Sequence, residues 1–312
     1  MPEHTNNPSN APIDELPSEG QLYDLIFLMN STVWGRRLTY IDIENWLSNF
    51  QSDVFDIAYE RRMALLLLAN FVYYNEDEVR HLCRQMYRNF IHESLLKSSL
   101  TEDPSMAVKS ILGKTQFGEL GPPGKSGSVI LYYFRHENAL QESNIFNTAN
   151  PIPDHVDTIV YIDDVTVSGD QARTFLLDEN DNLLIQDKHI KILTLIATKE
   201  ATHDLGSIGI QVTSCIDLDD RSKCFSANSS IFHYFPNHLD NCRQFATIYG
   251  LKANPADPLG HSNGQYSFGF FYNVPDNTLP IFWSQHAGWK PVMPRYISNA
   301  VGGTQNEIGP YI

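Results

Sequence analysis

The sequence lacks the paired cysteines and the long apolar runs that mark several common protein classes. Its four cysteines lie far apart with no Cys-x-x-Cys spacing, which argues against a structural zinc site and against a disulfide scaffold. No apolar run is long enough for a membrane span, and residues 1–20 contain no apolar core for a signal peptide. We therefore expect a cytoplasmic protein without a membrane segment.

Basic residues are also scarce. The formal net charge is −15 and the isoelectric point is about 5.0, so the protein repels a nucleic-acid backbone over most of its surface. We expect nucleic acid to reach it only through a basic partner. The hydrolase and metalloprotease motifs Gly-x-Ser-x-Gly and His-Glu-x-x-His are absent as well.

What the sequence does contain is an acidic pair after an apolar run, in residues 158–171. Ile159 to Ile162 predict a buried parallel strand, and Asp163 and Asp164 follow it. Ligands of open α/β sheets bind at the carboxyl ends of strands, where these acids are suited to sugar hydroxyls or to Mg²⁺. The next residues predict a turn and a helix start whose N–H groups face a phosphate: Val167, Ser168, Gly169, Asp170 and Gln171.

This segment resembles the phosphoribosyl-pyrophosphate loop of type I phosphoribosyltransferases. The resemblance implies that Asp163 and Asp164 hold the ribose hydroxyls as catalytic residues and Mg²⁺ ligands, and that residues 167–171 cradle the 5′-phosphate. It also implies a parallel sheet flanked by helices. The sequence departs from the family pattern at Val167 and Gln171, where hydroxyl residues are usual, and at Asp170, where a second Gly is common.

A narrower resemblance spans roughly residues 20–296 and covers phosphoribosyltransferase-like proteins of bacterial conflict systems, some associated with retrons. It implies an anti-phage effector that binds phosphoribosyl pyrophosphate or a nucleotide, makes or breaks an N-glycosidic bond, and has a partner such as a reverse transcriptase. The departures listed above leave an alternative open, in which the protein is a catalytically degenerate nucleotide-sensing or scaffold subunit of a defence complex.

Residues 121–128 contain Gly-Lys-Ser, but they do not form an ATP-binding loop, because Glu119 stands where the first Gly of that motif belongs. The resemblance makes this segment the pyrophosphate loop, formed by Lys125, Ser126, Gly127 and Ser128. The N–H groups would serve this role if residues 129–134 form a helix, although a strand fits the same pattern. Arg135 could neutralise a leaving pyrophosphate, and residues 139–156 are either a lid or a surface loop.

Two further predictions concern the rest of the chain. Asn277 and Trp283 could bind a nucleobase, with core packing as the alternative. Composition divides the chain into a disordered tail (1–20), a helical module for partner docking or of winged-helix type (21–104), and a phosphoribosyltransferase-like domain (105–312). Further expected elements are strands at residues 190–198, 209–216 and 266–272, and a helix at residues 237–249 that ends at Gly250 as its C-cap.

Overall fold

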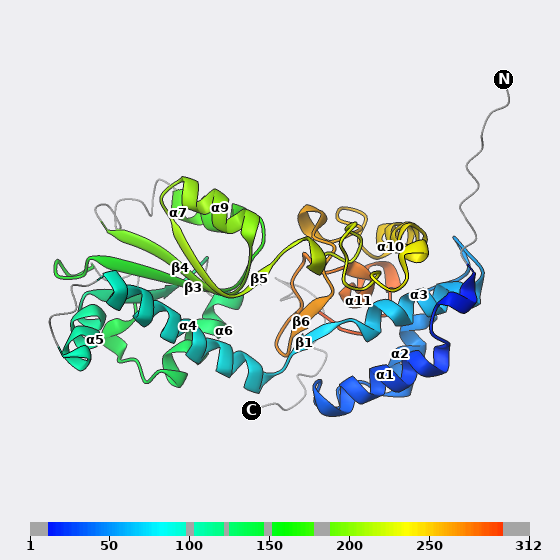
Figure 1. Ribbon diagram of the computed structural model, residues 1–312, viewed down its shortest axis with the longest axis horizontal. Helices are drawn as coiled ribbons and strands as arrows, with labels where there is room; N and C mark the ends of the chain where they lie inside the picture. Colours follow the sequence, from blue (N-terminus) through cyan, green and yellow to red (C-terminus); the bar gives the residue numbers. More distant parts are fainter. Residues whose placement is uncertain (1–11, 98–102, 122–124, 147–151, 178–187, 296–312) are drawn as a thin grey trace, which may run out of the picture.

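Two lobes are visible in the computed structural model, which describes residues 12–97, 103–121, 125–146, 152–177 and 188–295 (Figure 1). We call residues 75–218 the sheet lobe and residues 12–74 with 219–295 the helical lobe. One large hydrophobic core fills the helical lobe, and two smaller cores cover the two faces of the sheet. Within the described residues, no helix has the length and apolarity to cross a membrane.

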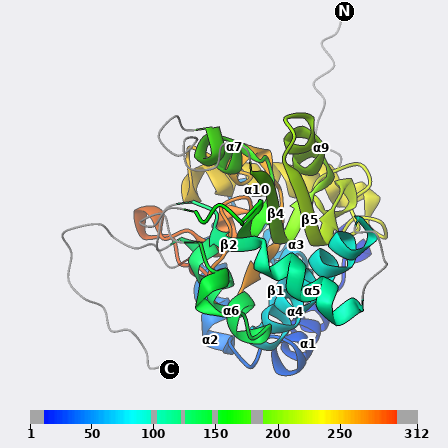
Figure 2. The same ribbon diagram turned by 90° about the vertical axis from the view of Figure 1, so that its left-hand side faces the viewer.

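The sheet lobe contains four parallel strands in the order β2, β3, β4, β5, with helices on both faces (Figure 2). The strands are β2 (Thr115–Glu119), β3 (Thr158–Thr166), β4 (His189–Thr198) and β5 (Gln211–Leu218). The helices are α4 (Glu76–Lys97), α5 (Pro104–Gly113), α6 (Ser126–Glu137), α7 (Asp170–Leu177) and α9 (Lys199–Ser207). The predicted α/β fold with a parallel sheet flanked by helices is confirmed.

The direction of strand addition reverses between β2 and β3. After β2 the chain forms α6 and then reaches Ile145, which bridges Phe117 on the edge of β2 that β3 does not occupy. The chain then returns to β3, and the next two helices, α7 and α9, lie on the opposite face from α6 (Figures 1 and 2). Such a reversal opens a crevice at the carboxyl ends of the two strands, which is where ligands bind in sheets of this kind.

The helical lobe is built from the N-terminal and the C-terminal parts of the described chain. Its helices are α1 (Glu19–Thr32), α2 (Tyr40–Leu47), α3 (Ile57–Ala69), α10 (Leu239–Ala253) and α11 (Pro280–Trp283). A small parallel sheet pairs β1 (Val72–Tyr74) with β6 (Phe268–Phe270). Short 3₁₀ turns are η1 (Ile13–Glu15), η2 (Glu142–Asn144), η3 (Asp220–Ser222), η4 (Pro236–His238), η5 (His261–Asn263) and η6 (His286–Gly288).

The N-terminal helices follow the sequence pattern, but they do not form a module of their own. Thr39 and Asp42 form the expected capping box of α2. Helices α1 to α3 share one core with residues from the C-terminal third of the chain, whereas α4 packs under the sheet, where Phe90 lies 5.4 Å from Phe117 between ring centroids. The division between the cores therefore does not coincide with the limit predicted at residue 104.

Gly250 has a different role from the one predicted. Helix α10 does not end there but continues to Ala253. A Cβ atom at Gly250 would lie 1.9 Å from the carbonyl oxygen of Pro258, so only glycine allows the following loop to lie against the helix. The strand expected at residues 266–272 is also shorter, since β6 covers residues 268–270 and pairs with β1 rather than joining the large sheet.

Replacing Gly250 with Ala should destabilise the protein by about 1–3 kcal/mol, the usual cost of forcing extra atoms into a packed interior. Urea unfolding would measure the change. The matched control is Gly206→Ala in α9, where a Cβ atom meets nothing within 4 Å. This second change should be neutral or stabilising by up to about 1 kcal/mol. Equal unfolding midpoints for Gly250→Ala and the parent would contradict the role of Gly250 in the close contact with Pro258.

Candidate functional site

Asp163 and Asp164 lie inside β3 rather than beyond its end. The ladder between β3 and β4 continues past them, with Asp163 opposite Thr194, and β3 ends at Thr166. The two side chains are 3% and 7% exposed. The sequence predicted a strand over Ile159 to Ile162 because apolar residues stop there. The strand extends further because its backbone continues to pair after the side chains become polar.

The two carboxylates face opposite sides of the sheet, because side chains alternate along a strand. Ile162 belongs to the core on the side of the sheet that α4 and α6 cover, so Asp164 faces that side. Tyr161 packs on the opposite side, with α7 and α9, so Asp163 faces α7 and α9. An Oδ1 atom of Asp163 accepts from the N–H of Asp164, and Oδ1 of Asp164 accepts from the N–H of Val165, each at 2.9 Å. The two side chains also hydrogen-bond to each other, so the acids form one pair at the sheet edge.

Burial changes the acidity of both groups. Burial raises the pKa of Asp163 well above its ordinary value, and the charge of Asp164 raises it further. Burial also raises the pKa of Asp164, and hydrogen bonding from Ser126 opposes that rise. No cation balances the pair, since neither acid belongs to an ion pair within the described residues. Carboxylates whose pKa is perturbed by burial and by a neighbouring charge are typical of functional sites.

Tyr272 connects the helical lobe to this acidic pair. Its hydroxyl donates to Oδ2 of Asp164 at 3.1 Å, and its ring stacks on Phe270 of β6. Burial raises the pKa of Tyr272 well above its ordinary value, and the Asp164 charge adds to that effect, so the phenol remains a donor. The sequence predicted an aromatic strand over residues 266–272 but no role for Tyr272. No local signal marks a contact that joins residues 108 positions apart.

The predicted phosphate turn follows β3. Gly169 has φ of 75°, a left-handed conformation that favours glycine, and α7 begins at Asp170, as expected. The N–H of Asp170 donates to Oγ of Ser168 at 3.3 Å. The sequence missed Thr166, which is buried and whose hydroxyl has no hydrogen-bond partner among the residues that the structure describes. A buried hydroxyl without a partner at the start of this turn is suited to a ligand oxygen.

Thr198 anchors the turn from the neighbouring strand. Its hydroxyl donates to the carbonyl of Val167 at 2.6 Å and accepts from the N–H of Ala201, which begins the next helix. Thr198 is the last residue of β4, so the carboxyl ends of two adjacent strands hold one loop in place. The sequence did not single out Thr198, although its place at the end of a predicted strand is the signal that identified the acids.

The segment predicted as the pyrophosphate loop lies beside the same edge. Residues 126–137 form helix α6, which resolves the choice between helix and strand, and Lys125 is its exposed N-cap residue. A Cβ atom at Gly127 would lie 3.0 Å from the carbonyl oxygen of Leu120 and 3.1 Å from that of Ile162. Glycine thus lets the first turn of α6 approach the ends of β2 and β3. Ser128 donates to Glu119.

Arg135 is not brought to this edge. It lies in the last turn of α6, nine residues after Ser126, which corresponds to about 13 Å along a helix. The lid prediction falls partly outside the described residues, because residues 147–151 are not described. In the described part of that segment, Ile145 bridges β2 at the edge of the sheet and Val156 is buried.

Asn277 and Trp283 lie in the helical lobe, where their polar groups already have partners. The amide of Asn277 donates to the carbonyl of His261 at 3.1 Å, and the indole N–H of Trp283 donates to the carbonyl of Thr278 at 2.8 Å. Both side chains are buried. Buried side chains with internal hydrogen-bond partners are what the core-packing alternative predicted. Binding of a nucleobase by Asn277 and Trp283 stays a prediction.

A cavity of about 500 Å³ lies beside the phosphate turn and is lined by residues of both lobes. Val167 and Ser168 line it from the turn, and Tyr266 lines it from the helical lobe. Two lysines and five carboxylates also line it: Lys199, Lys223, Asp170, Glu200, Asp204, Asp219 and Asp220. Because carboxylates outnumber lysines, the cavity is better suited to a hydroxyl-rich or amino-bearing group than to a free phosphate.

Comparison with family models places this geometry in a known family. The model described as PRTase-CE, where PRTase denotes phosphoribosyltransferase, matches residues 43–295, which include the sheet lobe, the helical lobe from residue 43 onward and the whole candidate site. The chain belongs to the PRTase-CE family. It is therefore a phosphoribosyltransferase-like protein, as the resemblance predicted.

Solved structures show weaker similarity. An orotate phosphoribosyltransferase from Aeropyrum pernix is 15% identical with a TM-score of 0.23, over 36% of this chain and 71% of that chain. A Helicobacter pylori xanthine-guanine-hypoxanthine phosphoribosyltransferase is 14% identical with a TM-score of 0.28, over 47% of this chain and 83% of that one. TM-scores of this size support no further conclusion, so the assignment depends on the family match. Comparison with curated proteins gave no match.

The buried acid pair predicts a stability cost. Replacing Asp163 with Asn keeps the acceptor oxygen but removes a charge that burial disfavours. The pKa of Asp163 is higher in the folded protein than its ordinary value of 3.8, so the folded state holds the proton more tightly than the unfolded state does. The parent therefore loses stability as pH rises from 3.8 through the folded pKa, whereas the variant, which has no proton to lose there, does not. The variant should therefore melt higher at neutral pH, by about 2–4 °C per kcal/mol. Thermal scans from about pH 4 to about pH 8 should show the gap widening.

The control for this measurement is Asp240→Asn, because the Asp240 side chain is 88% exposed on α10. Its melting temperature should follow that of the parent at every pH, since an exposed ion pair contributes little. If Asp163→Asn melts below the parent across the whole pH range, the carboxylate is stabilising and the assignment of a cost is wrong.

Proposed function

We propose that this protein binds a 5-phosphoribosyl group at the carboxyl ends of β2 and β3. The observation that supports the proposal most directly is the convergence there of a buried carboxylate pair with the first turns of α6 and α7. Helix N-termini present free N–H groups and a positive dipole end, which suit phosphate oxygens. The family match covers all three elements.

Each part of the ligand has a matching part of the site. Asp163 and Asp164 would accept hydrogen bonds from the ribose hydroxyls, residues 167–171 would bind the 5′-phosphate, and residues 125–128 would bind the pyrophosphate side. The hydroxyl of Thr166 lies between the acids and the phosphate turn along the chain, and it would add one hydrogen bond. Asp170 lines the cavity beside the turn, so the backbone N–H groups of the turn, rather than that cavity, would bind the 5′-phosphate.

The reaction in this proposal takes place at the anomeric carbon of the ribose. The bond from that carbon to a pyrophosphate oxygen breaks, the pyrophosphate leaves with the electron pair, and a bond to a nitrogen of the acceptor forms. In the reverse direction an N-glycosidic bond of a nucleotide breaks. As positive charge develops on the sugar, the ionised acids beneath it stabilise that charge, and the helix N-termini stabilise the departing anion.

Mg²⁺ fits this site as a partner of the substrate rather than as a fully protein-bound ion. Within the described residues, no group of three or more His, Cys, Asp and Glu side chains could hold a metal. Mg²⁺ usually takes one or two carboxylates together with substrate phosphates and water. Asp163 and Asp164 would supply those carboxylates, and the ion would lower the cost of ionising them.

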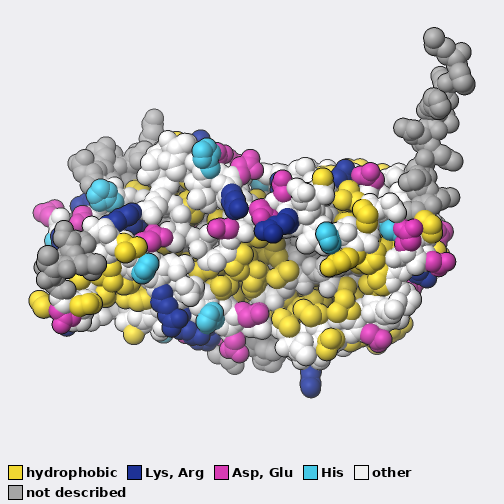
Figure 3. All heavy atoms as spheres, viewed as in Figure 1, with side chains coloured by type: hydrophobic (Ala, Val, Ile, Leu, Met, Phe, Trp, Pro, Cys, Tyr) yellow, Lys and Arg dark blue, Asp and Glu magenta, His cyan; other side chains and the backbone are white. Residues whose placement is uncertain are grey.

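The proposed setting is an effector of an anti-phage defence system, as the narrower resemblance implies. A partner such as a reverse transcriptase would then dock on the helical lobe. Several large apolar side chains on α1 and α2 are exposed there, including Leu28, Tyr40 and Ile41, and Figure 3 shows hydrophobic side chains over that lobe. A partner would bury such surface.

A second candidate function is a sensor or scaffold that has lost turnover. One observation favours it: the acids are buried and already hydrogen-bonded within the protein. Asp164 is 7% exposed and already accepts a hydrogen bond from Tyr272 of the other lobe. In this case a phosphoribosyl ligand would displace the contact with Tyr272 and change the relation of the two lobes without any bond being broken.

Phosphoribosyl pyrophosphate with Mg²⁺ should raise the melting temperature of the protein, because a ligand that binds only the folded state stabilises it by mass action. Asp164→Asn should abolish most of this shift. Asp240→Asn makes the same chemical change at an exposed position and should keep it. No thermal response of the parent at millimolar ligand would contradict the binding proposal.

A phage-challenge assay separates the enzyme from the scaffold when the protein is expressed with its neighbouring genes. The Asp163→Asn, Asp164→Asn double variant keeps the acceptor oxygens of both residues, so loss of protection would reflect the missing charges rather than unfolding. A catalytic effector should lose protection by at least about tenfold in plaque counts, since the charges act on the transition state. Full protection by the folded double variant would leave only the scaffold function, and no protection by the parent would contradict the defence setting.

A further inference from the structure

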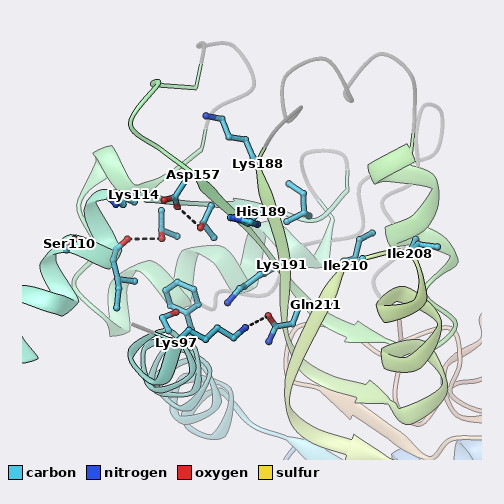
Figure 4. A pocket seen from close by; sticks show the side chains of 17 residues that line it. Lys97, Ser110, Lys114, Asp157, Lys188, His189, Lys191, Ile208, Ile210 and Gln211 are labelled. Carbon is cyan, nitrogen blue, oxygen red and sulfur yellow. Dashed lines mark hydrogen bonds between the residues drawn. The ribbon is translucent and has the colours of Figure 1, made fainter. Parts of the chain in front are cut away.

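A second pocket lies at the opposite edge of the same sheet, among the amino ends of the strands (Figure 4). Its volume is about 670 Å³, within the range of small-molecule sites. The first residues of all four strands line it, from Thr115 of β2 to Gln211 of β5. Along β3, Thr158 in this pocket lies five residues before Asp163, or about 17 Å in an extended strand. The pocket is therefore separate from the site proposed above.

The charge of this pocket is opposite to that of the whole chain. Four of the chain's 22 Lys and Arg residues line it, namely Lys97, Lys114, Lys188 and Lys191. Asp157 is the one carboxylate among its described lining residues, so four positive charges and one negative charge leave a formal +3. The chain as a whole carries −15. A concentrated positive charge on an acidic protein attracts anions to that place alone.

The lysines have no carboxylate partners in the described ranges, since none of the four belongs to an ion pair there. Lys97 donates to the amide oxygen of Gln211 at 3.0 Å, and Lys191 lies over the ring of Phe90 at 5.6 Å. Figure 4 shows Lys97 and Lys191 extending toward one another across the pocket. Burial lowers the pKa of Lys191, and the charge of Lys97 lowers it further. Glu93 lies behind the lining, where its charge raises the pKa of Lys191 and its carboxylate accepts from Gln211 and from Thr213 of β5.

Part of the remaining wall is apolar, and the rest carries polar side chains that include His189 and Gln211. Isoleucines from three elements line it beside Phe90, including Ile111 of α5, Ile190 of β4 and Ile210 before β5. A free inorganic anion would leave this wall exposed to water, whereas a molecule with both phosphate and an apolar or aromatic part would cover it. Lys188, which donates to the carbonyl of Val156 at 2.6 Å, retains two further donors for such a ligand.

We propose that this pocket binds a small organic phosphate of nucleotide size, with its phosphates against Lys97 and Lys191 and its apolar part against the isoleucines. The proposal does not depend on the phosphoribosyl site. Binding here would relieve the repulsion between the two lysines.

Isothermal titration of the full chain with ATP, in EDTA to remove Mg²⁺, tests the proposal. The expected result is one site per chain with millimolar or tighter affinity. The Lys97→Gln, Lys191→Met double variant removes both facing charges and leaves side chains only slightly shorter than lysine, and it should weaken binding at least about tenfold. The matched control, Lys109→Gln with Lys290→Met, removes two exposed charges outside the pocket and should bind like the parent.

Two further ligands test the phosphate contacts and the apolar contacts separately. Adenosine, which has no phosphate, should bind much more weakly than ATP. Inorganic tripolyphosphate should also bind more weakly than ATP, because it leaves the apolar wall uncovered. Equal affinity for ATP in the parent and the Lys97→Gln, Lys191→Met variant would overturn the site, as would no ATP binding at all. This variant should keep the thermal shift with phosphoribosyl pyrophosphate, so that failure of one site is distinguishable from failure of the other.

Discussion

Burial of two adjacent carboxylates at the end of a central strand is the constraint on which the rest of the site depends. The paired backbone of β3 and β4 holds Asp163 and Asp164 in place, and the only described donors to their side chains are nearby N–H and hydroxyl groups. Ionising both acids without a ligand is unfavourable. The same arrangement becomes favourable once sugar hydroxyls, a cation or developing positive charge lies against them.

The helical lobe is part of this arrangement rather than an appendage. Helices α1 to α3 share a core with the last described segments of the chain, and β1 pairs with β6. The loop after β6 brings Tyr272 to Asp164. The family match spans both lobes, so the contact between them belongs to the matched region. A partner that moves the helical lobe would therefore act on the acid pair through one hydrogen bond.

The two edges of the sheet carry opposite charge. Carboxylates gather at the carboxyl edge, where helix N-termini supply the positive potential for phosphate. Lysines gather at the amino edge, where the strands begin and helices α4, α5 and α9 end. A phosphate would thus be held by backbone N–H groups at one edge and by side-chain ammonium groups at the other, and the shared strand β3 is the physical connection between the two.

Sequence alone determined the elements with strong local signals. The apolar run before Asp163, the glycine turn at Gly169 and the helix from Asp170 were predictable because period, propensity and backbone freedom are local properties. What the sequence could not determine was proximity. Tyr272 at Asp164, Thr198 on the loop and the cluster of lysines all depend on residues distant in the chain, and only packing brings them together. Gly250 shows the same limit: its signal predicted a helix end, but the tertiary contact with Pro258 decided why glycine is there.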